Sequence, residues 1–340
     1  MEAKRVFAGR SRLAPLLTTI VCCVLQAPAF LQAAELKAAS INSAEFSGKP
    51  PAAHKISPLG IRLQVLLARA HFSPGEIDGK FGENAKKALR AYAEAQQLAG
   101  VDGLTNDVWQ KLVTDSASVL MTYQITDKDT AGPFLARLPH KMEDMKNLVR
   151  LDYTSAREEL AERFHMSEEL LAVLNLGQQF RKAGATITVT DLNSSANRSA
   201  KIGRLEVDKA RQTIRVFDAS NQLVDFYPAT VGSEEKPSPS GTLRITGVEH
   251  NPTYHYNHKY HFNGVHAKSP FTIRPGPNNP VGTVWINLSA EGYGIHGTPD
   301  PGKVSKAESH GCIRLTNWDA EQLAREVKKG IPVEFVDNSS

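Results

Sequence analysis

The stretch Glu308-Ser309-His310-Gly311-Cys312-Ile313-Arg314-Leu315 decides how the C-terminal part of this chain is interpreted. It contains Cys312, the only cysteine outside the apolar segment near the N-terminus, and His296 lies sixteen residues upstream. A lone thiol flanked by glycine and histidine, with a second histidine within reach of one loop, is the pattern expected of a cysteine nucleophile and its base. The stretch therefore predicts a site for nucleophilic catalysis.

Two histidines compete for the role of base. A free cysteine with a pKa near ~8.5 is mostly protonated at neutral pH, so a neighbouring imidazole must take its proton. His310 is two residues from Cys312, and in an extended segment both side chains would point to the same face. His296 follows the strand-like Tyr293-Gly294-Ile295, and a loop of about thirteen residues would return the chain beside it. The residues alone leave both histidines open.

The residues on either side of Cys312 suit the binding of a peptide. Gly311 lets the backbone approach a substrate, because any side chain there would crowd the attacked carbonyl. The backbone N–H groups of Gly311 and Cys312 are candidates for an oxyanion hole, where one good donor contributes ~3 kcal/mol. Arg314 lies on the Cys312 face of an extended segment, where its planar fork suits a substrate carboxylate.

Residues 201–337 consist mainly of short β-forming runs separated by turn residues. Asp208-Lys209-Ala210 and Ala219-Ser220-Asn221 are hairpin signals between such runs. One clear helix stands out, from Trp318 to Lys329, with Asn317 as its expected cap. Short strands at this density predict a closed or sandwiched, mainly-β domain.

Taken together, these residues resemble the L,D-transpeptidase catalytic family, and the resemblance covers about residues 200–337. The matching pieces are His296-Gly297-Thr298, Ser309-His310-Gly311-Cys312-Ile313-Arg314-Leu315-Thr316-Asn317, Pro239-Ser240-Gly241-Thr242 and Asn279-Pro280-Val281-Gly282. The Ser-His-Gly-Cys-x-Arg signature is highly specific.

The resemblance implies a role for each residue around the thiol. In that family the upstream histidine is the base, which corresponds to His296, and the backbone carbonyl beside it, which corresponds to Gly297, orients its ring. His310 would then contribute to the structure and electrostatics of the site. Ser309 and Arg314 would support the loop and the substrate.

The family reaction has two halves and needs no cofactor or metal. The thiolate attacks the L-to-D peptide bond after the third residue of a peptidoglycan tetrapeptide stem, which releases D-alanine and leaves a thioester. The side-chain amine of a second stem then resolves the thioester as a 3→3 crosslink. A lysine of a wall-anchored lipoprotein or a free D-amino acid is an alternative acceptor, and water would make the protein a carboxypeptidase.

A second histidine-rich segment invites a different interpretation. His250, His255, His258, His261 and His266 fall within seventeen residues, and three of them at a spacing of three could be imagined as a metal site. The segment lacks other ligand types beyond Glu249, and its proline and asparagines indicate an irregular loop. We interpret residues 249–276 instead as a lid or cleft wall, in which Tyr254, part of a family-like Asn-Pro-x-Tyr match, offers hydrogen bonds to the stem.

The first 29 residues are typical of an export signal: a basic start, an apolar run from Leu13 to Leu25, and Ala27-Pro28-Ala29 as a cleavage site. A retained N-terminal anchor is the alternative. Cleavage would remove four basic residues and one acidic residue, which lowers the formal charge of +4 to +1. For the mature chain we then expect no nucleic-acid binding and no stable membrane span. With a single cysteine it can form no internal disulfide. We expect it in the periplasm, associated with the wall.

Three further segments are expected between the signal and the catalytic domain. Residues 30–54 have the composition of a flexible tether, and residues 191–200 that of a linker. Residues 55–115 predict a three-helix bundle, and their Pro-Gly-x-Ile-Asp-Gly-x-Phe-Gly turn resembles the peptidoglycan-binding module family. Residues 120–190 loosely resemble a lysin-motif unit, which leaves sugar binding and a plain spacer both open.

The sequence thus predicts a multidomain α+β protein: a helical peptidoglycan-binding bundle, an α/β middle region and a mainly-β catalytic domain. Its expected partners are peptidoglycan stem peptides and glycan strands. A thiol hydrolase on the same scaffold, a non-catalytic wall-binding protein and a metal-dependent peptidase are the competing functions.

Overall fold

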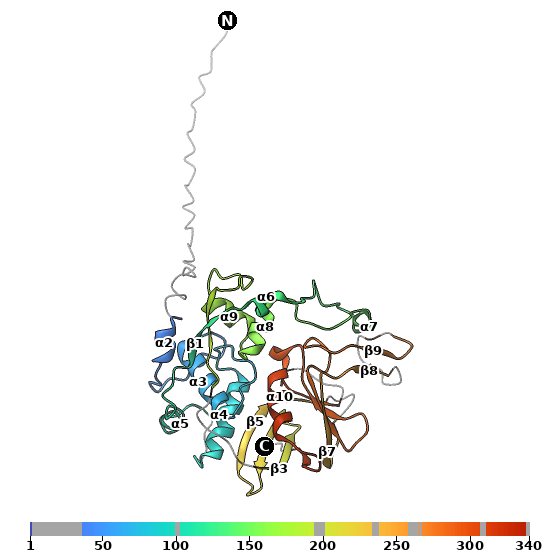
Figure 1. Cartoon of the computed structure of the whole chain (residues 1–340). Helices are drawn as coiled ribbons and strands as arrows, with labels where there is room; N and C mark the ends of the chain where they lie inside the picture. Colours follow the sequence, from blue (N-terminus) through green and yellow to red (C-terminus); the bar gives the residue numbers. More distant parts are fainter. Residues whose placement is uncertain are drawn as a thin grey trace.

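The computed structural model describes Met1 and residues 36–98, 103–193, 201–232, 238–257, 265, 267–306 and 311–337. A helix-rich N-terminal half packs beside a β-rich C-terminal half (Figure 1). This arrangement confirms the predicted α+β fold class. The expected leader lies outside the described residues. Within the described part of the chain, none of the helices is both long and apolar enough to cross a membrane.

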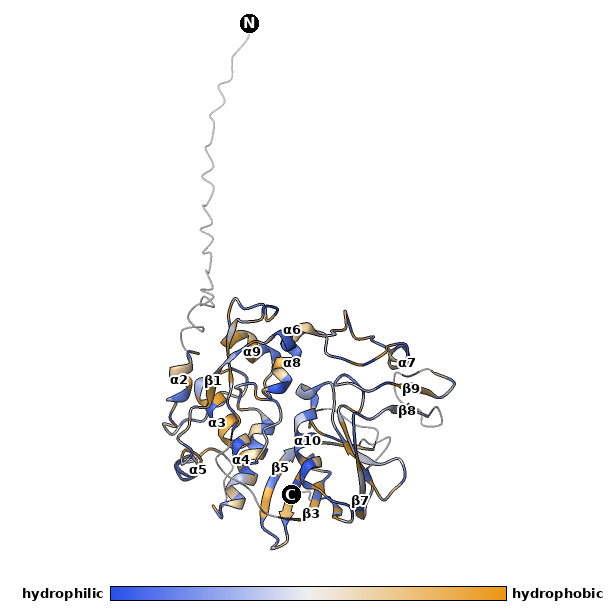
Figure 2. Cartoon of the chain, viewed as in Figure 1, coloured by the Kyte–Doolittle hydropathy of each residue, from blue (hydrophilic) through white to orange (hydrophobic). Residues whose placement is uncertain are grey.

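The predicted helical bundle is present and is organised around one buried helix. Nine of the twelve residues of α3 are buried, and Figure 2 shows apolar residues concentrated along it. Ser57 caps α3 by accepting a hydrogen bond from the Gly60 amide, and Thr105 caps the third helix in the same way. The helices are α3 (Pro58–Arg69), α4 (Glu83–Ala95) and α5 (Asn106–Leu112).

The flexible tether expected over residues 30–54 is wrong for its described part, residues 36–54. These residues include helix α2 (Ala38–Asn42), whose Ile41 is fully buried. The Glu45 carboxylate accepts hydrogen bonds from Arg62 and from the indole of Trp109. Apolar and charged anchors therefore fix this segment to the bundle, although its average composition is that of a linker.

The middle region begins and ends with two strands that pair with each other. Strand β1 lies antiparallel to β2, with Leu120 opposite Thr190, and four helices lie between them in the chain. The elements are β1 (Leu120–Gln124), α6 (Asp127–Ala131), α7 (Met142–Met145), α8 (Ala156–Arg163), α9 (Glu168–Leu174) and β2 (Thr186–Thr190). The likeness to a lysin motif stays a prediction.

The bundle and the middle region share one hydrophobic core. The same cluster of buried side chains contains Leu67 and Trp109 of the bundle, and Leu160 and Val189 of the middle region. The two segments are also joined through backbone, because the Ile77 amide donates to the His165 carbonyl and the Ser167 amide donates to the Ile77 carbonyl. The N-terminal half is thus one packed body.

The C-terminal half is a nine-stranded sheet with one long helix, α10 (Asn317–Glu326), packed into its core. The strand order is β5-β4-β3-β13-β7-β10-β11-β12-β6, and the β3–β13 and β11–β12 pairs are parallel. The two predicted hairpins, β3–β4 and β4–β5, are confirmed. The strands are β3 (Ile202–Asp208), β4 (Thr213–Asp218), β5 (Leu223–Pro228), β6 (Thr230–Val231), β7 (Gly241–His250), β10 (Val284–Leu288), β11 (Gly294–His296), β12 (Ile313–Arg314) and β13 (Pro332–Val336).

The two halves are joined along the β5 edge of this sheet. Phe72 forms a parallel bridge with Phe226: the Phe226 amide donates to the His71 carbonyl, and the Ser73 amide donates to the Phe226 carbonyl. The Phe226 side chain belongs to the core of the N-terminal half although its backbone is part of β5. The Ser73 hydroxyl donates to the buried Asp319 carboxylate at 3.0 Å.

Candidate active site

Two short parallel strands bring the predicted nucleophile and base together. In β11 and β12, Ile295 pairs with Ile313 and His296 pairs with Arg314. Cys312 directly precedes Ile313, and Ile313 is buried in the core, so Cys312 and Arg314 share the opposite face. The register therefore places Cys312 two positions before the His296–Arg314 pair, directly ahead of the strand that lies beside His296.

His296 is held in one tautomer. Its Nδ1 lies 2.7 Å from the Gly297 carbonyl oxygen, which can only accept, so Nδ1 carries the hydrogen and Nε2 keeps its lone pair. The side chain is buried, and burial, together with the positive charge of Arg314, lowers the pKa of His296 to about 3. The imidazole is therefore neutral in the resting site and is available as a proton acceptor.

Trp285 covers this histidine from the neighbouring strand β10. The two residues are directly opposite, and their rings stack with centroids 5.2 Å apart and planes 10° apart. The indole also lies over Gly294, where an added Cβ would sit 2.5 Å from Trp285 Cε2. Glycine at position 294 is thus what allows the indole to lie flat beside the histidine.

Cys312 directly precedes β12 and is half-buried. Its thiol donates to the Gly292 carbonyl, with Sγ and the oxygen 3.6 Å apart. Gly311, just before it, has a φ of +96°, a conformation that an L side chain rarely adopts, and its carbonyl accepts a hydrogen bond from the Ser238 hydroxyl at 2.8 Å. The Ser238 hydrogen bond therefore holds the turn that precedes Cys312, the predicted nucleophile.

Arg314 and Tyr254 complete the surroundings of the thiol. Burial raises the pKa of Tyr254, the negative charge of ionised Cys312 raises it further, and Arg314 acts in the opposite direction. Burial lowers the pKa of Arg314, and Asp300, Cys312 and Tyr254 oppose that effect. The buried Arg314 Nε has no hydrogen-bond partner among the residues that the structure describes. The Nε–H group is therefore available to donate a hydrogen bond to an oxygen of a ligand.

The expected lid contains more regular structure than the sequence indicated. Strands β8 (Tyr254–Tyr256) and β9 (Phe271–Ile273) pair as an antiparallel hairpin, whereas we expected an irregular loop. His255 is exposed, with Nδ1 3.2 Å from the Thr272 hydroxyl. His258, His261 and His266 lie outside the described residues, as do Ser309 and His310.

Asn317 connects the loop that follows His296 to the middle region, and the sequence did not indicate this role. Asn317 was expected to cap α10, but Thr316 does so by accepting from the Asp319 amide. The Asn317 side chain instead accepts from the Thr283 amide and donates to Glu162 of α8. An added Cβ at Gly297 would lie 2.2 Å from its Oδ1.

The sequence also did not indicate the role of Trp285. Its place in a β-forming run predicts a strand, but not that its ring stacks on His296. Of the residues proposed from sequence, the structure brings together Cys312, His296, Gly297, Gly311, Arg314 and Tyr254.

Comparison with protein families gives matches to two family models. Residues 202–335 match the model of the L,D-transpeptidase catalytic domain, and residues 61–112 match that of a "Putative peptidoglycan binding domain".

Among known proteins, "Putative L,D-transpeptidase YkuD" of Bacillus licheniformis is 32% identical over 130 residues, which cover 38% of this chain and 63% of the relative. "Probable L,D-transpeptidase YbiS" of Escherichia coli K12 is 27% identical over 134 residues, or 38% of this chain and 44% of the relative. The chain thus spans less than two thirds of the length of these relatives.

The solved structures that the chain matches include the catalytic domain of the E. faecium L,D-transpeptidase. It is 21% identical, and the match covers 41% of this chain and all of that domain, with a TM-score of 0.32. L,D-transpeptidase 3 from Mycobacterium tuberculosis is 16% identical over 46% of this chain and 76% of its own, with a TM-score of 0.33. By sequence, residues 202–335 of this chain are therefore similar to L,D-transpeptidase catalytic domains, and residues 61–112 to peptidoglycan-binding domains.

Proposed function

We propose that this protein is an exported peptidoglycan L,D-transpeptidase that acts in the periplasm with Cys312 as its nucleophile. The observation that supports the proposal is the parallel pairing of β11, which ends at His296, with β12, which directly follows Cys312; His296 Nδ1 is hydrogen-bonded to a backbone carbonyl. A neutral imidazole with a free Nε2 lone pair is the form that can accept a proton from a thiol.

In the proposed first half-reaction, Cys312 Sγ attacks the carbonyl carbon of the L-to-D bond in a tetrapeptide stem while His296 accepts the thiol proton. The C–N bond then breaks, and His296 returns the proton to the departing D-alanine amine. Arg314 and Tyr254 are proposed to hold the stem through its oxygens, and Gly311 and Cys312 to offer backbone N–H groups to the oxyanion. The product is a thioester on Cys312.

In the second half-reaction an amine of another stem attacks the thioester, and the thiol leaves with a proton. This forms a 3→3 crosslink. A lipoprotein lysine in place of the stem amine would attach a protein to the wall, and water would give a thiol hydrolase. Ser309 and His310 are proposed to support the loop that precedes the nucleophile.

Mass spectrometry of the mature protein incubated with disaccharide-tetrapeptide tests this proposal, with Cys312→Ala as the comparison. A dimer lighter by one D-alanine than two monomers, absent with the variant, is the expected result. Tripeptide without dimer would favour the hydrolase, and unchanged substrate with both proteins would favour a non-catalytic wall-binding protein.

We also propose that the middle region contacts the glycan. A cavity of about 870 Å³ opens there, a size that suits a small ligand, and the residues that line it include Arg157, Gln178, Arg181 and the half-buried Phe134. Amide and guanidinium groups hydrogen-bond to sugar hydroxyls, and aromatic rings pack on sugar faces. Arg181→Gln is expected to reduce sedimentation of the protein with purified peptidoglycan, whereas unchanged sedimentation would indicate a spacer.

A further inference from the structure

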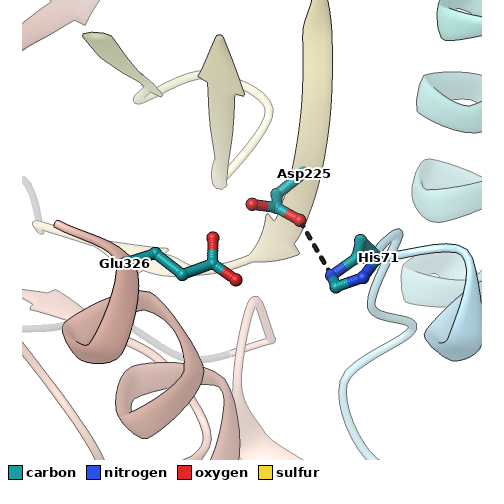
Figure 3. A group of neighbouring side chains, drawn as sticks. All are labelled: His71, Asp225 and Glu326. Atoms are coloured by element: carbon teal, nitrogen blue, oxygen red, sulfur yellow. Dashed lines mark ion pairs between the residues drawn. The ribbon is translucent and has the colours of Figure 1, made fainter. Parts of the chain in front are cut away.

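A histidine and two carboxylates meet where the N-terminal half joins the catalytic domain. His71 follows the end of α3, Asp225 lies in the middle of β5, and Glu326 is the last residue of α10. Their ligating atoms all lie within 4.8 Å of one another, and Figure 3 shows the three side chains pointing to a common centre. None of them belongs to the set around Cys312.

We propose that His71, Asp225 and Glu326 bind one divalent transition-metal ion, with zinc as the best fit, which fastens the peptidoglycan-binding domain to the catalytic domain. The proposal does not depend on the reaction at Cys312.

The spacing of two of these groups is that of ligands on one metal. His71 Nδ1 and Asp225 Oδ1 are 3.3 Å apart. Two ligand atoms that each lie about 2.0 Å from a tetrahedral zinc ion are separated by about 3.3 Å. Glu326 is half-buried at the end of a helix, and its flexible side chain can close the remaining distance.

The backbone holds two of these ligands rigidly. The carbonyl of His71 accepts from the Phe226 amide, so the histidine is tied to the strand residue next to Asp225. The Asp225 side chain is completely buried. Metal sites are most precise when their ligands lie on such fixed elements.

Gln322, one helical turn before Glu326, can complete the coordination. Its Nε2 lies 3.0 Å from His71 Nδ1, and a half-turn of the amide would bring the Oε1 atom to that position instead. A neighbouring cavity of about 100 Å³, lined in part by His71, Ser73 and Asp319, has room for a few waters in any open position.

The charges of the three side chains are balanced better by a divalent metal ion than by a proton on His71. With neutral imidazole, Asp225 and Glu326 carry two negative charges, and protonation of His71 would offset only one. A divalent ion would offset both, which matters most for the fully buried Asp225. One imidazole with two carboxylates suits zinc, whereas Mg²⁺ and Ca²⁺ prefer oxygen ligands throughout.

The experiment is a calorimetric titration of the mature chain, freed of metal with a chelator, with zinc chloride alone. All samples carry Cys312→Ser, which removes the thiol as a competing ligand. One zinc per chain is expected. His71→Ala should weaken binding at least ~100-fold and Glu326→Gln at least ~10-fold, while His54→Ala, which removes an exposed histidine of the same half, should leave it unchanged.

A second measurement guards against variants that fail to fold. Zinc should raise the melting temperature of the parent but not that of the Glu326→Gln protein, whose circular dichroism should match the parent's. Absence of zinc binding by the parent would overturn the proposal. So would binding that His71→Ala and Glu326→Gln both leave intact, since the ion would then be at other histidines, such as those of residues 250–266.

Discussion

At the residue scale, the site is built to keep His296 uncharged. An imidazolium beside the thiolate is the usual resting state expected for a cysteine–histidine pair. Here burial and the charge of Arg314 both disfavour the imidazolium, and the pKa of His296 falls to about 3. This is consistent with the proposed role of His296 as a base during attack, with burial as the main cause of its low pKa and Arg314 as the second.

This arrangement predicts an acid limb of kcat/KM that lies well below pH 6.5, the ordinary pKa of histidine. Arg314→Gln removes the positive charge that disfavours the imidazolium, so the pKa of His296 should rise and the acid limb should move to higher pH. Initial rates of D-alanine release across pH would show the shift. Arg137→Gln, which removes an exposed arginine, should not move it, and an equal shift in both variants would contradict the assignment.

The indole over the histidine gives a second prediction. Gly294→Ala would place a methyl group 2.5 Å from the Trp285 ring, so the ring must leave its position against His296. We expect kcat/KM to fall at least tenfold and stability to fall by about 1–3 kcal/mol. The matched control is Gly247→Ala in β7, where an added Cβ meets nothing within 4 Å. Similar losses in both variants would mean that the ring contact is unimportant.

At the scale of elements, two carboxyl groups of α8 in the middle region bind the catalytic loops: Glu158, which accepts from Asn278, and Glu162. Glu162 accepts hydrogen bonds from the Tyr153 hydroxyl and from Asn317, whose side chain also accepts from the Thr283 amide. Burial raises the pKa of Glu162 to about 7. The folded protein therefore holds a proton on this group at pH values where the unfolded chain has released it.

Because the pKa of Glu162 is raised in the folded state, its contribution to stability falls as the pH rises. The contribution of Glu162 to stability is fully present below its unfolded pKa of about 4.3 and is lost as the pH rises through about 7. Glu162→Gln should flatten the fall in unfolding free energy between pH 5 and pH 8, measured by urea denaturation. Glu291→Gln, at an exposed carboxylate, should keep the slope of the wild type. A wild-type slope in the Glu162 variant would refute the protonated state.

How far the sequence predicts these elements depends on how local their signals are. Cys312 and His296 were predicted because their signature and strand patterns lie within a short window. The partners of Asn317 lie 34 and 155 residues away, so no local pattern pointed to them. No local pattern indicates that the His165 ring stacks on that of Trp318, with centroids 5.0 Å apart. Only packing between distant segments produces that contact.

At the scale of the whole molecule, the sequence predicted the parts but not how they join. Wall-binding modules on a flexible connection were expected, and composition alone favoured that interpretation. The structure instead has one core that runs through the bundle and the middle region and includes Phe226 from the catalytic sheet. A few buried side chains, such as Ile41 and Phe226, join the segments, and the average composition of a segment does not reveal such single residues.

The shared core predicts that the mature chain unfolds as one cooperative unit, because the junction couples the two halves. Phe226→Ala removes the catalytic domain's contribution to that core, which should cost about 3–5 kcal/mol and split one calorimetric transition into two. Phe335→Ala is the matched control, because Phe335 is buried in the catalytic core alone. It should lower the melting temperature without splitting the transition. Two transitions in the wild-type protein would show that the halves unfold independently, and the packed junction would then contribute little to holding them together.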